Sequence, residues 1–201
     1  MLSTLAVFAV GFVMRPLGAL FFGWFSDRIG RQRGMVLSMG ITAFGSLIIA
    51  VSPTYASAGA VASALLLLAR LMQGFGIGGE IGASHTYLSE AAPTARRGLW
   101  SSSMYVAVTT GVLCATVQAA LLKGWLTAYQ MTGWGWRIPF VIGALLGIYA
   151  FYLRRGLAEN HAFREARQDD SAGRPSLVTG IWENRRAVLQ VVGLSLGGTV
   201  L

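Results

Sequence analysis

The feature that most constrains this chain is a series of apolar runs, each about as long as a lipid bilayer is thick. A helix needs about 20 residues to cross roughly 30 Å of hydrocarbon. With 54% hydrophobic and only 12% charged residues, the chain lies far from an ordinary soluble domain. It therefore predicts an all-α integral membrane protein. The five complete runs are Leu2 to Phe25, Met35 to Val51, Ala60 to Ala83, Leu99 to Leu122 and Trp136 to Leu153.

A sixth apolar run begins near Ala187 and stops at the last residue, Leu201. It is too short to cross a bilayer comfortably, so we expect a truncated helix and a chain cut from a longer protein. The expected organisation is a partial N-terminal transmembrane bundle over residues 1–153, a cytoplasmic linker over 154–186, and the start of the next helix over 187–201.

Positive charges gather in alternate connections between the expected helices. A formal net charge of +8 would suggest a nucleic-acid or other anionic partner in a soluble protein. Here the arginines follow the positive-inside pattern, which predicts that three basic segments face the cytoplasm. No nucleic-acid recognition module accompanies the charge, so we expect the lipid bilayer, and no nucleic acid, as the partner of these basic segments. The basic residues are Arg28, Arg31 and Arg33, then Arg96 and Arg97, and, after the fifth run, Arg154, Arg155, Arg164, Arg167, Arg174, Arg185 and Arg186.

Two arginines, Arg15 and Arg70, lie inside apolar runs. An arginine at the centre of a membrane helix costs about 2.5 to 3.5 kcal/mol, so it usually faces a protein interior or a cavity that a solute uses. Arg15 precedes Asp27 by twelve residues, about 18 Å of helix, which predicts a position near the membrane midplane. It either binds the solute or pairs with a carbonyl or carboxylate to hold helices together.

The third run carries a polar stripe. Arg70, Gln73, Gly74, Ile77 and Glu80 recur at helical spacings of three and four residues. With Arg15, the first two are the expected substrate-binding residues. Glu80 is the sole carboxylate predicted well inside the membrane. For such a group burial favours the protonated form, whereas a nearby cation favours the charged form. It either carries the coupling proton or neutralises an arginine near the cytoplasmic end.

Glycines are frequent in the same run. Because they lie inside an apolar segment, they favour close helix packing over a phosphate-binding loop. The residues are Gly74, Gly76, Gly78, Gly79 and Gly82.

Several motifs resemble one transporter family. The segment GWFSDRIGRQRG resembles the signature loop between the second and third helices of the major facilitator superfamily. The segments RLMQGFGIGGEIGASHTYLSEAAPTARRG, WGWRIPFVIGALLG and RRGLAENHAF are similar to its metabolite:proton symporter branch, which includes permeases for citrate, α-ketoglutarate, shikimate and proline or betaine. The resemblance implies a major facilitator-type bundle that begins at the second helix, lacks the C-terminal half and works by alternating access.

The resemblance also implies a cytoplasmic latch, a cluster of ion pairs that forms in one conformation and breaks in another. Isolated surface pairs contribute only about 0 to 1 kcal/mol, so several must act together. The expected members are Asp27, Arg28, Arg31, Glu90, Arg96, Arg97, Arg154, Arg155 and Glu159.

These features favour proton-coupled symport of a small organic solute, with a carboxylate as the expected chemical class because buried guanidinium groups suit it. Two alternatives stay open: a non-transporting truncated membrane fragment, or a drug:proton antiporter of the same superfamily. We expect no enzyme and no cofactor, because the sequence contains no metal-ligand cluster, nucleophile arrangement or phosphate loop.

Overall fold

The computed structural model describes residues 2–156 and 185–186. The chain divides into two units, Met1–Phe163 and Arg164–Leu201. The expected linker, the truncated sixth helix and Glu159 lie outside the described residues, apart from the first and last residues of the linker region, so the predicted domain boundaries stay predictions. Everything below concerns the first unit.

The described part of this unit consists of helices joined by short connections. The five long helices coincide with the five apolar runs, and each is long and apolar enough to cross a membrane. The prediction of an all-α membrane fold with five spans is confirmed. The elements are α1 (Leu2–Ile29), α2 (Arg31–Val51), α3 (Tyr55–Ala58), α4 (Ala60–Ala91), the 3₁₀ turn η1 (Thr94–Arg96), α5 (Arg97–Trp125), α6 (Ala128–Gly133), the 3₁₀ turn η2 (Gly135–Arg137) and α7 (Ile138–Arg155).

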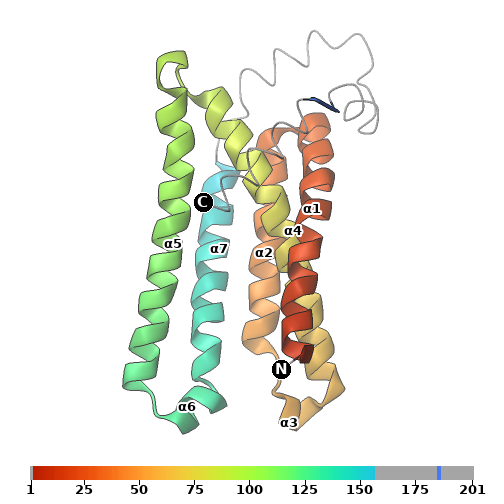
Figure 1. Ribbon diagram of the computed structural model, residues 1–201, viewed down its shortest axis with the longest axis vertical. Coiled ribbons are helices and arrows are strands. Elements are labelled where there is room, and N and C mark those ends of the chain that lie inside the picture. Colours follow the sequence, from red (N-terminus) through yellow and green to blue (C-terminus); the bar gives the residue numbers. More distant parts are fainter. Residues whose placement is uncertain (1, 157–184, 187–201) are drawn as a thin grey trace. The chain divides into compact units, whose positions relative to one another are not determined.

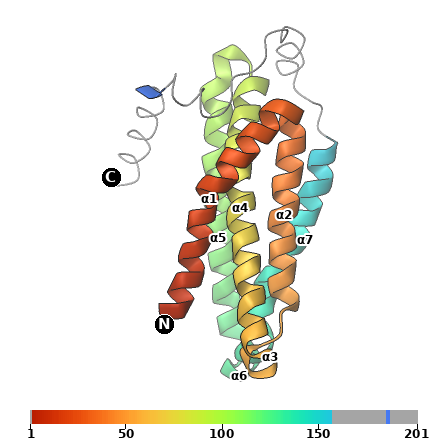
Figure 2. The ribbon, with the colours of Figure 1, turned by 90° about the vertical axis from the view of Figure 1, so that its right-hand side faces the viewer.

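The long helices run up and down, so their connections fall at two opposite ends (Figure 1). The short helices α3 and α6 lie at the end where the chain starts. The α1–α2 junction, the α4–α5 connection and the end of α7 lie at the other end, which we call the basic end (Figures 1 and 2). The basic connections that alternate along the sequence therefore lie together at one end of the bundle (Figure 1).

The junction of α1 and α2 is tighter than the sequence predicts. The expected basic loop is a single residue, Gly30, at φ 130°, a conformation open to glycine. Gly23 of the same motif lies within α1. Arg28, Arg31 and Arg33 are therefore helical residues. One glycine suffices because it can reverse the chain without a side-chain clash.

Glycines let the backbones of α1 and α4 touch. A methyl group on Gly74 would collide with the carbonyl oxygen of Gly11, one on Gly78 with that of Arg15, and one on Gly18 with that of Phe75. The predicted packing role of the α4 glycines is confirmed for Gly74, Gly76, Gly78 and Gly79. Among the residues that the structure describes, no atom lies near the position a methyl group on Gly82 would take, so the packing prediction fails there within this part of the chain.

Hydrogen bonds tie α2 and α7 together at both ends. Near the α3 end, the guanidinium Nη2 of Arg137 donates to the carbonyl oxygen of Ser52 at 2.9 Å. At the basic end, Gln32 Nε2 donates to the carbonyl oxygens of Arg154 and Arg155 at 3.1 and 2.9 Å. Each bond satisfies carbonyl groups at a helix C-terminus, which lack partners within their own helix. The two antiparallel helices therefore form a pair fixed at both ends.

The α1–α4 contact makes a direct prediction. Gly74→Ala should destabilise the protein by about 1 to 3 kcal/mol, because the added methyl group overpacks a backbone contact that cannot retreat. Gly82→Ala, in the same helix but facing open space, is the matched control. Thermal unfolding of the purified protein in detergent measures both, and equal midpoints would contradict the packing role.

Candidate functional site

A polar network joins α4 to α2 inside the bundle. Arg70 Nη1 donates to Gln73 Oε1 at 3.1 Å, and Gln73 Nε2 donates to Ser46 Oγ at 2.9 Å. The Arg70 guanidinium also lies 5.7 Å from the ring centroid of Phe140 in α7. The structure thus brings together two of the three predicted substrate-binding residues. We had not identified Ser46, although it continues a helical series with Ser38 and Thr42 that marks the face of α2 toward α4.

Arg15 lies on α1 in a different environment. Its guanidinium stacks 4.1 Å from the ring centroid of Phe12, a cation–π contact, and its Nε atom is buried without a hydrogen-bond partner. Its carbonyl oxygen lies against Gly78. Among the described residues Arg15 is not joined directly to Arg70 or Gln73. It retains hydrogen-bonding capacity that a buried guanidinium normally uses.

Glu80 forms an ion pair with Arg154, a residue of the final turn of α7. Arg154 Nη2 lies 2.9 Å from Glu80 Oε1, and the two side chains are only 23% and 20% exposed. The partner shows that Glu80 lies toward the basic end of α4. This pairing is the arrangement expected if Glu80 neutralises an arginine. A proton carrier also needs a partner while it is charged, so the ion pair is compatible with both roles. The role of Glu80 as a proton carrier therefore stays a prediction.

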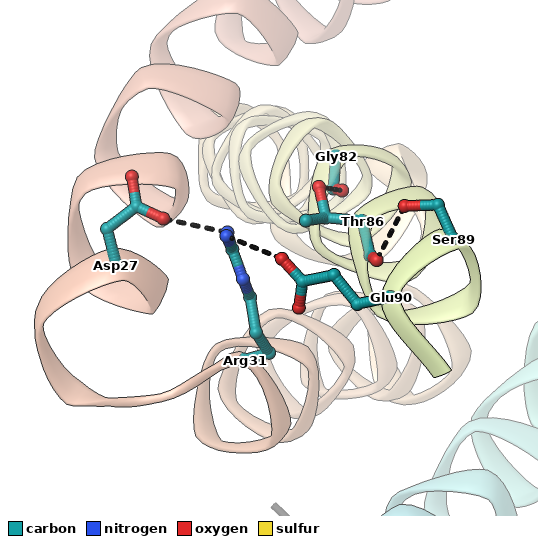
Figure 3. A network of polar contacts seen from close by, with 6 residues as sticks. All are labelled: Asp27, Arg31, Gly82, Thr86, Ser89 and Glu90. Atoms are coloured by element: carbon teal, nitrogen blue, oxygen red, sulfur yellow. Dashed lines mark hydrogen bonds and ion pairs between the residues drawn. The ribbon is translucent and has the colours of Figure 1, made fainter. Parts of the chain in front are cut away.

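Three helices meet in a cluster at the basic end (Figure 3). Arg31 of α2 lies between two carboxylates, 2.7 Å from Asp27 Oδ1 of α1 and 3.1 Å from Glu90 Oε1 of α4. Glu90 lies within α4, because that helix runs to Ala91 rather than ending near Ala83. The structure therefore assembles three predicted latch residues, and Arg31 is the one that contacts both acids.

The other predicted latch residues that the structure describes have contacts outside this cluster. Arg28 stacks 4.8 Å from the Trp24 ring centroid, and Arg155 stacks 5.6 Å from that of Phe151. Arg96 and Arg97 are exposed at η1 and the start of α5, with no ion pair in the described part of the chain. The described latch residues all lie at the basic end of the bundle (Figure 1), where the sequence predicts them, but they do not form one cluster there.

The residues that tie α2 to α7, Gln32 and Arg137, were not predicted to have this role. No local sequence pattern marks a side chain that caps the C-terminus of another helix, because the partner carbonyls are distant in sequence. Within residues 2–156 and 185–186, no group of acidic, histidine or cysteine residues could hold a metal ion.

Five helices long and apolar enough to span a membrane, with partly buried charged side chains between them, are typical of membrane proteins of the solute-transporter class. The family comparison agrees: the sugar (and other) transporter family matches residues 1–179, and the chain belongs to this family. The resemblance predicted from the motifs is therefore confirmed.

Curated relatives include permeases and symporters. The chain is 44% identical, over 100% of its length, to an alpha-ketoglutarate permease of Escherichia coli. It is 40% identical over 78% of its length to a putative proline/betaine transporter of Staphylococcus haemolyticus, and 36% identical over 83% to a citrate-proton symporter of Klebsiella pneumoniae. The chain spans 45%, 34% and 38% of these relatives, less than half of each.

The fold is also similar to a solved transporter. The xylose transporter XylE of E. coli, in a partially occluded inward-open conformation, matches with a TM-score of 0.73 over 79% of this chain and 38% of that one. At 20% identity this likeness concerns the fold alone.

Proposed function

We propose that this chain is part of a proton-coupled symporter that moves a small, carboxylate-bearing organic metabolite across the cytoplasmic (inner) membrane by alternating access. The basic end faces the cytoplasm in this proposal, and the C-terminal half of the same transporter supplies the opposite wall of the pathway. The observation that carries the proposal is the pair of half-buried arginines, Arg15 and Arg70, within spanning helices of a chain whose relatives are named as metabolite permeases.

The contacts of these arginines support a carboxylate as the solute group. Arg70 is oriented by Gln73, which is itself bonded to Ser46, so the guanidinium is held before any solute arrives. Arg15 has a buried Nε atom without a partner. A guanidinium offers two parallel donors to a carboxylate, and prior orientation lowers the entropy that binding costs.

The relatives support the same chemical class. Ketoglutarate and citrate carry carboxylates, and proline and betaine are zwitterions that carry one too. A site built around guanidinium groups would serve all of these solutes, while the rest of the pathway would select among them.

We predict that Arg15→Gln weakens solute uptake about tenfold to a hundredfold, the range for loss of one charge-assisted hydrogen bond in a buried site. Uptake of labelled ketoglutarate or citrate into vesicles containing the full-length transporter measures the effect. Arg33→Gln is the control, because it removes an exposed arginine from the basic end. Normal membrane insertion of both variants is expected. Undiminished uptake by Arg15→Gln would rule out its binding role.

A second prediction concerns energy coupling through Glu80. Glu80→Gln keeps the shape and most of the hydrogen-bonding capacity but cannot exchange a proton. The variant should still exchange labelled solute across the membrane, yet fail to accumulate it when a pH difference is applied. Exchange and accumulation are measured on the same vesicles, so loss of folding would show as loss of both. Full proton-driven accumulation would assign coupling to another residue.

A third prediction concerns the cluster of Asp27, Arg31 and Glu90. Asp27→Arg replaces an ion pair at 2.7 Å by a repulsion between like charges. Net uptake should fall severalfold while solute binding persists, because the cluster lies about 18 Å of helix away from the level of Arg15. Asp27→Asn, which removes the attraction without adding repulsion, should have a smaller effect. Loss of solute binding would show that this cluster shapes the site instead of gating it.

A further inference from the structure

The ion pair of Glu80 and Arg154 joins two helices that otherwise hardly meet. Both α4 and α7 pack along α2, but their own backbones approach each other at few points. Across this space Arg154 Nη2 lies 2.9 Å from Glu80 Oε1, and the two side chains are about three-quarters and four-fifths buried, respectively. Because the attraction requires a charged carboxylate, uptake of a proton by Glu80 would remove it.

Arg154 is also held through its backbone. Its carbonyl oxygen accepts a hydrogen bond from Gln32 Nε2, as does that of Arg155. Gln32 is the neighbour in α2 of Arg31, which pairs with Asp27 and Glu90. A short series of contacts therefore leads from the Glu80 carboxylate to the cluster at the basic end.

The charged and titratable groups on the surrounding helices have other contacts. Arg15 of α1 stacks on Phe12, and Arg31 of α2 binds the two acids of the cluster. On α4 itself His85 contacts the ring of Tyr105 in α5, at 5.8 Å between centroids, and Arg97 at the start of α5 is exposed. In the described part of the chain, Arg154 is the charged group that contacts Glu80.

We propose that Arg154 is a positioning residue that makes the cytoplasmic end of α7 respond to the protonation of Glu80. The ion pair holds the end of α7 against α4, and a proton on Glu80 releases the end of α7 together with the start of α2, whose Gln32 binds it. This inference rests on the proposed function in one respect, the assignment of proton exchange to Glu80.

A buried thiol can report the release. Ser84 lies one turn beyond Glu80 in α4 and is 5% exposed. Cys114, the single cysteine of this sequence, and any cysteine in the rest of the full-length transporter are first replaced by serine. In that background a Ser84→Cys substitution would react slowly with a membrane-impermeant maleimide while the pair is intact. Glu80→Gln and Arg154→Gln should each raise the labelling rate about tenfold, an effect between those of losing an exposed and a fully buried ion pair. The double variant should label no faster than either single variant.

Two controls separate positioning from a general loss of stability. Arg33→Gln, which removes an exposed arginine at the same end, should leave the rate unchanged, and Arg154→Lys, which keeps the charge, should restore most of the protection. The labelling rate of the Ser84→Cys protein with Glu80 and Arg154 intact should approach, as the pH is lowered, the rate of the same protein carrying Glu80→Gln. Both rates are measured at the same pH, so the pH dependence of thiol reactivity itself cancels in their ratio. This comparison does not depend on whether the Arg154 variants fold.

An unchanged rate in Arg154→Gln, additive effects in the double variant, or a rate ratio independent of pH would each overturn the role of Arg154. The accumulation assay keeps the proposed function separate. If Glu80→Gln accumulates solute normally, the coupling role of Glu80 is wrong, whereas the labelling rates alone decide whether Arg154 holds α7.

Discussion

The close contact between the backbones of α1 and α4 is the constraint on which the rest of the bundle depends. Glycines at the crossing bring carbonyl oxygens of one helix to positions that a methyl group would occupy on the other. Without a hydrophobic driving force between helices in lipid, such close packing is a principal source of attraction. This contact also places the backbone of Arg15 beside Gly78. It therefore fixes the position of the Arg15 charge along the polar face of α4.

Helix α4 distributes three charges along the axis of the bundle. Arg70, Glu80 and Glu90 are spaced ten residues apart, about 15 Å of helix each. Each has its contact on another element: Arg70 on Phe140 and, through Gln73, on α2; Glu80 on Arg154 of α7; Glu90 on Arg31 of α2. A single helix therefore connects the proposed solute site, the proposed proton carrier and the cluster at the basic end.

The predictions from sequence succeeded where a property is local. Apolar run length predicted five helices, and the arginine pattern predicted that the basic residues at the α1–α2 junction, the α4–α5 connection and the end of α7 gather at one end of the bundle. The spacing of Arg70 and Gln73 placed them within hydrogen-bonding reach. The predictions failed where a boundary or a partner was at issue. The basic loop after α1 is one glycine, because helix ends depend on tertiary contacts that extend or shorten them. Among the described residues Gly82 has no close neighbour, and three of the predicted latch residues meet in one cluster.

By itself, the sequence determined that this chain crosses a membrane in helices, which family it resembles, and which of its charges lie inside apolar runs, where the cost of placing a charge in hydrocarbon applies. Only the tertiary structure decided which charges meet. Glu80 and Arg154 are far apart in the chain and lie on helices with few direct contacts, and Gln32 bonds carbonyl groups at the far end of α7. Such pairs depend on the order and rotation of helices in three dimensions, which no local pattern of residues contains.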